Sequence, residues 1–239
     1  IIRFNNGVIH FDHLFGKLGD GDFSLDGKIV SGESIDGKFN LTWAGPSGDE
    51  SLFAILPRVV GDTLVAVEIQ DGKSTLPNGR VSFLGSSWDD LLIAFFGDIS
   101  LDDVSIDVGI PLKKIKGVMH VFGTYSDEQL SEFEMSMVFE ELSTLGRVVT
   151  DVAGKLEFDS SSNRFVFNEV RGESTTGGVT VDGWIALDES KEYEIEILIA
   201  GIELSSVENE EIVASLEGEL RGWISIAGKR GDPESRRGV

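Results

Sequence analysis

The chain alternates apolar and polar residues over most of its length. In the stretch 179–187, for example, Val179, Val181 and Ile185 fall on one side, and Thr180 and Asp182 fall on the other. Successive side chains of a β-strand point to opposite faces, so each such run predicts a strand with one buried face. Runs of the same kind occur at 39–43, 104–108, 133–139, 156–158, 165–167 and 193–199.

Clusters of Gly, Asn, Asp and Ser separate these runs, at 71–72, 78–79, 159–163 and 176–178. Short links of this composition are typical of hairpins. The pattern therefore predicts a mainly β chain that forms an antiparallel meander, with each strand paired to the next. Asp89-Asp90 and Asp102-Asp103 break the alternation, and we predict turns or bulges there.

Two stretches depart from the strand pattern, and we expect short helical insertions at 48–73 and 205–217. Ser47 or Asp49 is suited to capping the first insertion, while Pro57 and Gly61 would interrupt a longer helix. The second insertion has acidic residues early in its course, which favours a helix start. The expected content is two or three short helices beside a dozen or more strands.

A weak internal echo is also present. The segment 16–28 (GKLGDGDFSLDGK) resembles 218–229 (GELRGWISIAGK), since each is an apolar, Gly-bounded run that ends in Gly-Lys, and shorter echoes are 35–39 (IDGKF) and 181–185 (VDGWI). The spacing is irregular, which argues against a strict solenoid. The pattern indicates a repeated β unit whose copies have diverged in sequence.

The strands have an apolar face that must be covered. Two or three short helices cannot cover a dozen strands. The sheet must therefore pack on a second sheet, curl on itself, or hold an apolar ligand or partner.

Charge and residue chemistry narrow the function. The 239 residues carry 20 Lys and Arg against 42 Asp and Glu, which gives a net charge of −22. This charge repels nucleic acid and anionic lipid headgroups, so we do not expect either to bind through a basic surface. The chain has no Cys, which excludes disulfides and thiolate chemistry.

His10-Phe11-Asp12-His13 is the one His/Asp cluster, and a strand would place only two of its ligands on one face. No catalytic or phosphate-binding motif occurs. We expect a protein that is not an enzyme and needs no metal or cofactor.

Three stretches, 97–123, 154–187 and 214–239, carry a resemblance to a known family. Their succession of Gly-bounded strands, small-residue turns and a closing Asp232-Pro233 segment resembles the AsmA-like superfamily, including TamB-type proteins, of Gram-negative cell envelopes. The resemblance implies an elongated, twisted antiparallel sheet curled into an open groove that shields acyl chains. The whole chain, 1–239, would then be one β-rich segment of a larger repeating β-groove protein.

The function that this resemblance implies is lipid transport or outer-membrane biogenesis in the periplasm. The partner would be a phospholipid or another acyl-chain lipid, and a segment not present here would anchor the protein to the membrane. The first residues, IIRFNNG, and the last, DPESRRGV, fit the expectation of a piece of a longer protein. The residues expected to line the groove are Phe133, Met135, Met137, Phe139, Leu156, Phe158, Phe165, Phe167, Val179, Val181, Ile195, Ile197 and Ile199.

Two other functions remain open on the pattern alone. Acidity and long turns also suit an extracellular β-rich adhesin or ligand-binding module. A carbohydrate-active enzyme would instead need a parallel β-helix with a cluster of carboxylates.

Overall fold

A computed structural model describes residues 1–49, 51, 69, 71–107, 111–126, 129–144, 147–174, 177–203 and 218–238. Within these ranges the elements are fourteen strands. They are β1 (Ile2–Asn5), β2 (Val8–Leu18), β3 (Gly21–Ser31), β4 (Ile35–Pro46), β5 (Asp71–Ser87), β6 (Asp90–Asp107), β7 (Pro111–Ser126), β8 (Gln129–Thr144), β9 (Arg147–Asp159), β10 (Arg164–Ser174), β11 (Gly177–Ala186), β12 (Glu192–Glu203), β13 (Glu219–Lys229) and β14 (Asp232–Gly238).

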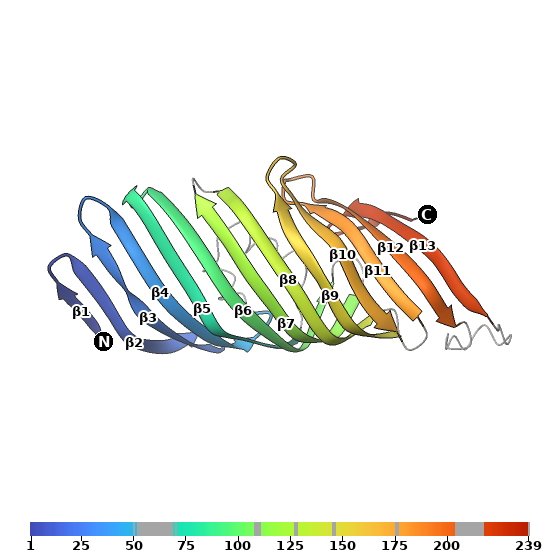
Figure 1. Cartoon of the computed structure of the whole chain (residues 1–239), viewed down its shortest axis with the longest axis horizontal. Helices are drawn as coiled ribbons and strands as arrows, with labels where there is room; N and C mark the ends of the chain where they lie inside the picture. Colours follow the sequence, from blue (N-terminus) through green and yellow to red (C-terminus); the bar gives the residue numbers. More distant parts are fainter. Residues whose placement is uncertain are drawn as a thin grey trace.

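All fourteen strands belong to one antiparallel sheet, and their order in space is their order along the chain (Figure 1). This confirms the predicted mainly β meander. β1 and β14 lie at opposite ends of the sheet, so the sheet is not closed. In the described part of the chain no second sheet covers either face, and the antiparallel pairing rules out a parallel β-helix.

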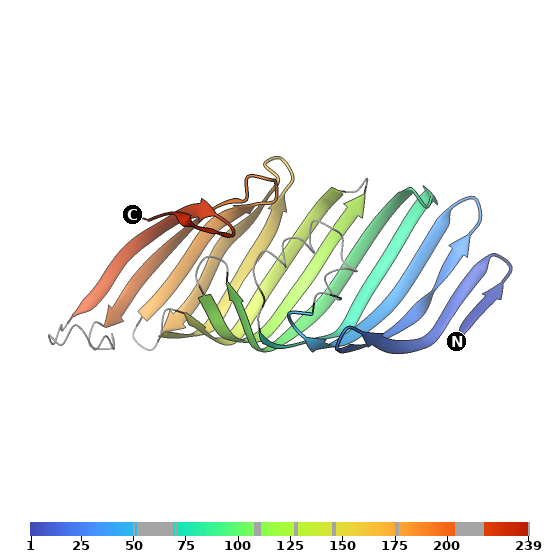
Figure 2. The same cartoon turned by 180° about the vertical axis from the view of Figure 1, so that it is seen from behind.

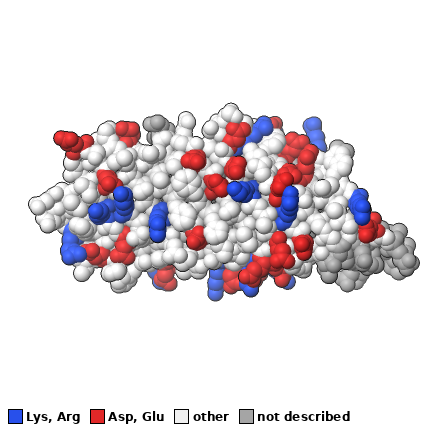
Figure 3. Space-filling model, in the orientation of Figure 1, with Lys and Arg blue, Asp and Glu red and all other residues white. Residues whose placement is uncertain are grey.

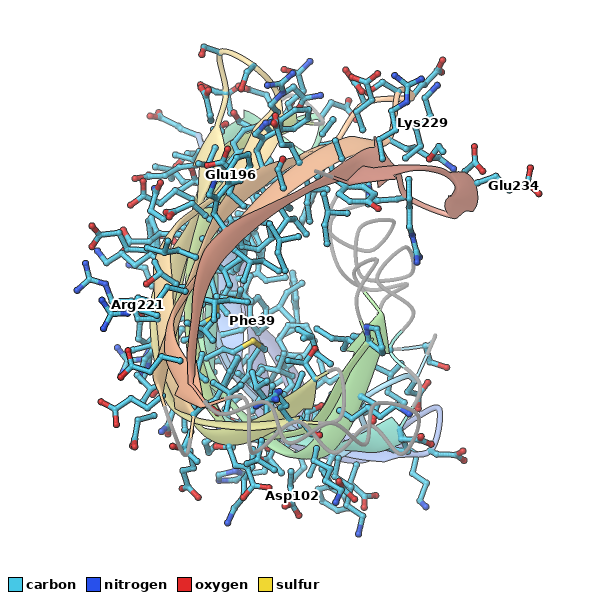
Figure 4. The ribbon with its side chains drawn as sticks, turned by 90° about the vertical axis from the view of Figure 1, so that its right-hand side faces the viewer. Phe39, Asp102, Glu196, Arg221, Lys229 and Glu234 are labelled. Carbon is cyan, nitrogen blue, oxygen red and sulfur yellow. The ribbon has the colours of Figure 1, made fainter. Side chains whose placement is uncertain are left out.

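The sheet is strongly curved. Figure 4 looks along its long axis and shows the strands bending around a common space, which Figure 2 views from the open side. Side chains of directly paired residues lie on the same face, so the register divides the sheet into a concave face and a convex face. Phe39 lies on the concave face, whereas Asp102, Glu196 and Arg221 point outward from the convex face (Figure 4).

β-Bulges explain how the strands bend. Asp103 in β6, Lys114 in β7, Asp151 in β9 and Glu169 in β10 have left-handed backbone conformations, with φ between 47° and 56°. Each lies between two apolar residues that both face the concave side, in the segments 101–104, 112–115, 149–152 and 167–170. An extra residue of this kind bends its strand while the apolar side chains stay in phase. The predicted irregularity at Asp102-Asp103 is confirmed as a bulge.

Asp-Gly pairs in two of the echoed segments, 16–28 and 181–185, stabilise bulges in β2 and β10. The backbone N–H of His13, at φ 47° in β2, donates to Asp26 Oδ1 at 2.8 Å on β3. The N–H of Glu169, also at φ 47°, donates to Asp182 Oδ1 at 2.8 Å on β11. The glycine after each Asp pairs with a phenylalanine just before the bulge, as in Phe11 with Gly27 and Phe167 with Gly183. In these two segments an Asp-Gly pair therefore accompanies a bulge on the neighbouring strand.

The predicted helices are not supported. Among the described residues only Ser51 has a helical assignment and no complete helix is present, and residues 71–73, which end the expected insertion 48–73, belong to β5. There Asp71 pairs with Ser105, and Lys73 pairs with Pro46 and Asp102, so strand pairing on both sides sets their conformation. The rest of this insertion, apart from residues 48, 49, 51 and 69, lies outside the described residues, as does all of 205–217.

The turn predicted at Asn78-Gly79 is wrong, because these residues lie within β5. The register of β5 against β6 shifts between Thr75 and Arg80, and the register against β4 shifts between Leu41 and Trp43. The local turn preference of Asn-Gly is thus expressed as an irregularity inside a long strand. The predicted link at 159–163 connects β9 to β10. Of the link predicted at 176–178, Gly177 and Gly178 instead begin β11, and residue 176 lies outside the described residues.

Candidate functional site

All thirteen residues expected to line a groove lie on the concave face. The register connects them strand by strand, for example Met135 to Leu156, Leu156 to Phe167, and Val181 to Ile197. Six are buried: Phe133, Met137, Phe139, Leu156, Phe165 and Ile195. The other seven are partly exposed: Met135, Phe158, Phe167, Val179, Val181, Ile197 and Ile199.

Aromatic rings join neighbouring strands in the middle of this face. The ring centroids of Phe95 and Phe133 are 6.4 Å apart, those of Phe133 and Phe165 are 5.0 Å apart, and those of Phe158 and Phe165 are 6.0 Å apart. These separations are typical of favourable aromatic pairs. The buried residues of this region form one cluster that also includes Val104 and Ile115, each 2% exposed.

The concave face also extends through the amino-terminal half, which the predicted lining omits. Phe11 and Phe39 have ring centroids 5.4 Å apart, and Phe39 stacks on Phe83 at 5.9 Å. The register places these three rings on the same face as Phe95 and Phe133. At the outer edge, Ile2 and Phe4 of β1 pair with Phe11 and Ile9 and are 60% and 74% exposed.

Glycine opposite an aromatic ring explains part of this omission. Gly123 of β7 lies between Phe95 of β6 and Phe133 of β8 in the register. A Cβ at Gly123 would lie 2.3 Å from Cζ of Phe95, so the missing side chain leaves room for the ring. Glycine at a concave position interrupts the apolar alternation in the sequence while it serves the packing. If a glycine opposite an aromatic residue is counted as an apolar position, the predicted lining extends to more strands.

The concave face is almost free of charge. Across β2–β13, the concave positions given by the register carry apolar residues, Gly, Ser, Thr and Tyr, and among charged residues only Arg147 at the start of β9. Such a lining offers mainly apolar contact, and these positions carry no Asp, Glu, His or Lys.

The convex face carries the charge. Figure 3 views this face and shows acidic and basic side chains spread over it, with uncharged surface between them. Glu134 and Glu157 are paired directly across β8 and β9, and Lys155 lies 3.4 Å from Glu134. Some apolar side chains are exposed here too: Leu198 and Trp223 face each other across β12 and β13 and are 54% and 60% exposed.

Asp12 and His13, from the cluster considered for metal binding, contact neighbouring strands, and His120 likewise pairs within the sheet. Asp12 accepts a hydrogen bond from Arg3 Nε at 2.6 Å, and this bond lowers the pKa of the Asp12 carboxyl. His13 occupies a bulge, with its Nδ1 3.1 Å from Asp26 Oδ1. His120 is paired with Asp98 at 2.7 Å on the convex face. Within the described residues there is no group of three or more potential metal ligands.

A similar structural role belongs to Asp49. Its carboxylate accepts the backbone N–H groups of Asp20 and Ser51, at 2.8 and 2.9 Å, and these bonds lower its pKa. It thereby joins the turn between β2 and β3 to the end of β4.

Comparison of the chain with protein-family models, with curated proteins and with solved structures found no match. No described helix has both the length and the apolar character needed to cross a membrane.

Proposed function

We propose that the concave face is a lipid-binding groove, in an AsmA-like envelope protein that serves lipid transport or outer-membrane biogenesis. The observation that carries the proposal is the apolar, nearly uncharged concave face, which no second sheet covers in the described part of the chain. Removing an acyl chain from water onto such a face is worth about 0.8 kcal/mol per buried CH2. The charged convex face would keep the protein in solution.

The length of the face suits a conduit. Neighbouring strands are about 4.8 Å apart, so fourteen strands in one row give a groove of roughly 60 Å. The apolar lining reaches Ile2 and Phe4 at one end, and Ile224 and Ile226 near the other. A lipid could therefore move along the groove without its acyl chains entering water. This matches the periplasmic setting that the family resemblance implies.

Two adjacent residues of β12 give a sharp test. Ile197 is partly exposed on the concave face, whereas Leu198 is 54% exposed on the convex face. We expect Ile197→Asn to weaken binding of an alkyl-chain fluorophore by about tenfold, since burial of a side chain of this size is worth about 1.5–3 kcal/mol. Leu198→Asn is the matched control and should bind as the wild type does. Native mass spectrometry of the purified chain should also detect co-purified lipid.

Two results would overturn the proposal. One is a wild-type chain that carries no lipid and does not bind the fluorophore. The other is equal binding by the two variants, both folded by circular dichroism. Met137→Glu and Phe139→Asp, at buried concave positions, are expected to abolish lipid retention or folding and serve as stronger perturbations.

The exposed Leu198–Trp223 pair favours a second candidate, an adhesin or ligand-binding module that uses the convex face. Clustered exposed apolar side chains mark binding surfaces. The same variants discriminate, because this function would be sensitive to Leu198→Asn and insensitive to Ile197→Asn.

A further inference from the structure

The carboxyl-terminal rim of the sheet differs in charge from the rest of the chain. Residues 228–238 hold four basic residues, Lys229, Arg230, Arg236 and Arg237, and two acidic residues, Asp232 and Glu234. Four minus two gives a local charge of +2, in a chain whose net charge is −22. Lys229 and Glu234 point away from the enclosed space (Figure 4).

Arg230 is a cation held at the rim without an anionic partner. Its Nη2 donates to the carbonyl of Ala186 at 2.7 Å, and its backbone N–H donates to the carbonyl of Lys191 at 2.8 Å. Nε is buried and has no hydrogen-bond partner among the described residues. No described carboxylate forms an ion pair with the guanidinium. Burial lowers the pKa of Arg230, while Asp188 acts on it only from a distance.

A second unpartnered polar atom lies at the same end of the sheet. Tyr193 is 3% exposed on the concave face, in a cluster with Ile185 and Ile195, and its hydroxyl has no partner within the described structure. A Cβ at Gly228 would lie 3.1 Å from this hydroxyl. Gly228 is directly opposite Tyr193 in the register and two residues before Arg230. The hydroxyl is therefore at the same end of the concave face as the guanidinium.

Arg236 adds a second guanidinium to this end. Its Cα would lie 3.3 Å from a Cβ at Gly228, which places the Arg236 backbone against the concave side. Arg237 pairs with Ala227, and Ala227 pairs with Glu194 of the convex face. Side chains alternate along a strand, so Arg236 and Arg237 belong to opposite faces.

We propose that Arg230, Arg236 and Tyr193 bind the phosphate headgroup of an anionic amphiphile whose alkyl chain lies along Ile195, Ile197 and Ile226. Guanidinium groups bind phosphate oxygens by charge-assisted hydrogen bonds, and a tyrosine hydroxyl adds a donor. The two guanidinium groups, and not the net charge of the rim, would attract the anion, because the adjoining turn brings Asp188 near Arg230 and pairs Glu192 with Lys229. The inference rests on the proposed lipid groove and specifies where the headgroup lies.

The test compares dodecyl phosphate, dodecanol and inorganic phosphate as competitors of an alkyl-chain fluorophore on the 239-residue chain. We expect dodecyl phosphate to bind about tenfold more tightly than dodecanol, as one or two charge-assisted hydrogen bonds would give, and inorganic phosphate alone not to compete. Arg236→Gln should remove most of the difference, whereas Arg237→Gln, its neighbour on the other face, should leave it unchanged. Arg230→Lys keeps the charge and should reduce the difference only in part.

The outcomes separate the two proposals. If dodecanol and dodecyl phosphate bind equally, the headgroup site is wrong and the groove stands. The same conclusion follows if Arg237→Gln has as large an effect as Arg236→Gln. If neither alkyl compound binds, the groove itself is wrong. Competition by inorganic phosphate alone would show a phosphate site that is independent of a lipid.

Discussion

At the scale of single residues, small side chains on the concave face are as important as large ones. A curved sheet brings side chains on its inner side closer together, so a large residue needs a small neighbour across the strand. Gly183 shows this most directly, because it is paired with Phe167 on one side and with Ile195 on the other.

We predict that Gly183→Ala destabilises the protein by about 1–3 kcal/mol. A Cβ at this position would lie 2.3 Å from the carbonyl oxygen of Glu194, and backbone atoms cannot move aside as a side chain can. The measurement is the free energy of unfolding by urea. Gly222→Ala is the control, because Gly222 is also on the concave face and has no atom within 4 Å of its would-be Cβ. Equal stability of the two variants would contradict the packing argument.

The sequence was sufficient to assign the faces of the predicted lining. Strict alternation in stretches such as 193–199 fixes which side chains share a face, and the register places all thirteen on the concave face. It was not sufficient for the rim residues Arg230 and Arg236. Their position depends on a turn and an irregular pairing of β13 with β14, which alternation does not reveal.

At the scale of strands and turns, polar residues act mainly through the backbone. Asp159 is the clearest case, in the turn between β9 and β10. Its carboxylate accepts hydrogen bonds from the hydroxyls of Ser161 and Ser162, each at 2.6 Å, and from the Ser161 N–H at 2.9 Å. These bonds lower the pKa of Asp159 from 3.8 to about 2.

The acid dependence of stability should report this turn. A carboxyl whose pKa is lower in the folded state stabilises that state above its unfolded pKa, and the stabilisation is lost as pH falls through the folded value. We therefore predict that Asp159→Asn lowers the melting temperature most above pH 4, and that its difference from the wild type shrinks as pH falls toward 2. Thermal unfolding followed by circular dichroism between pH 2 and 6 measures this.

Asp89→Asn is the control for this experiment. Asp89 lies in the turn between β5 and β6, and its carboxylate forms no hydrogen bond or ion pair within the described structure. A constant difference between Asp159→Asn and the wild type across the pH range would show that the turn does not depend on the ionised carboxylate.

Most of the bulges were not predicted from the local sequence. The sequence LDDV at 101–104 was read correctly as an irregularity, yet LKKI at 112–115, VTDV at 149–152 and FNEV at 167–170 have the same form. In each, two mostly polar residues separate two apolar residues of one face. The extra residue shifts the phase of alternation, so a search for strict period two ends the strand there. Allowing one such step within a strand recovers the long strands that the structure has.

At the scale of the whole molecule, charge opposes the compact state. The net charge is −22, and like charges are paired directly across strands, as in Asp182 with Glu196 and Glu134 with Glu157. We predict that the melting temperature rises as NaCl is raised from 10 to 300 mM, because the Debye length falls from about 30 Å at 0.01 M to under 10 Å. An unchanged or lower melting temperature would indicate that attractive pairs such as Lys155–Glu134 outweigh the repulsion.

A curled sheet was among the outcomes predicted from a general argument about the uncovered apolar face, and most of the residues that bend the sheet were not identified from the sequence. Too few helices were expected to cover the apolar face, so a second sheet, a curled sheet or a bound partner had to be considered. The described chain has one sheet, bent by bulges at positions that only the register reveals. The predicted helices did not enter this outcome, since the described ranges contain none.

Each strand makes its main contacts with the strands just before and just after it along the chain. Hairpins could therefore be duplicated or deleted without rerouting the backbone, and the remaining strands would keep their partners. Unfolding should begin by fraying at the outermost strands and advance inward, as a zipper opens, because a nearest-neighbour array has no distant contacts to hold its ends. Related chains could then differ in the number of strands, and so in the length of the sheet, while each strand keeps the same curvature.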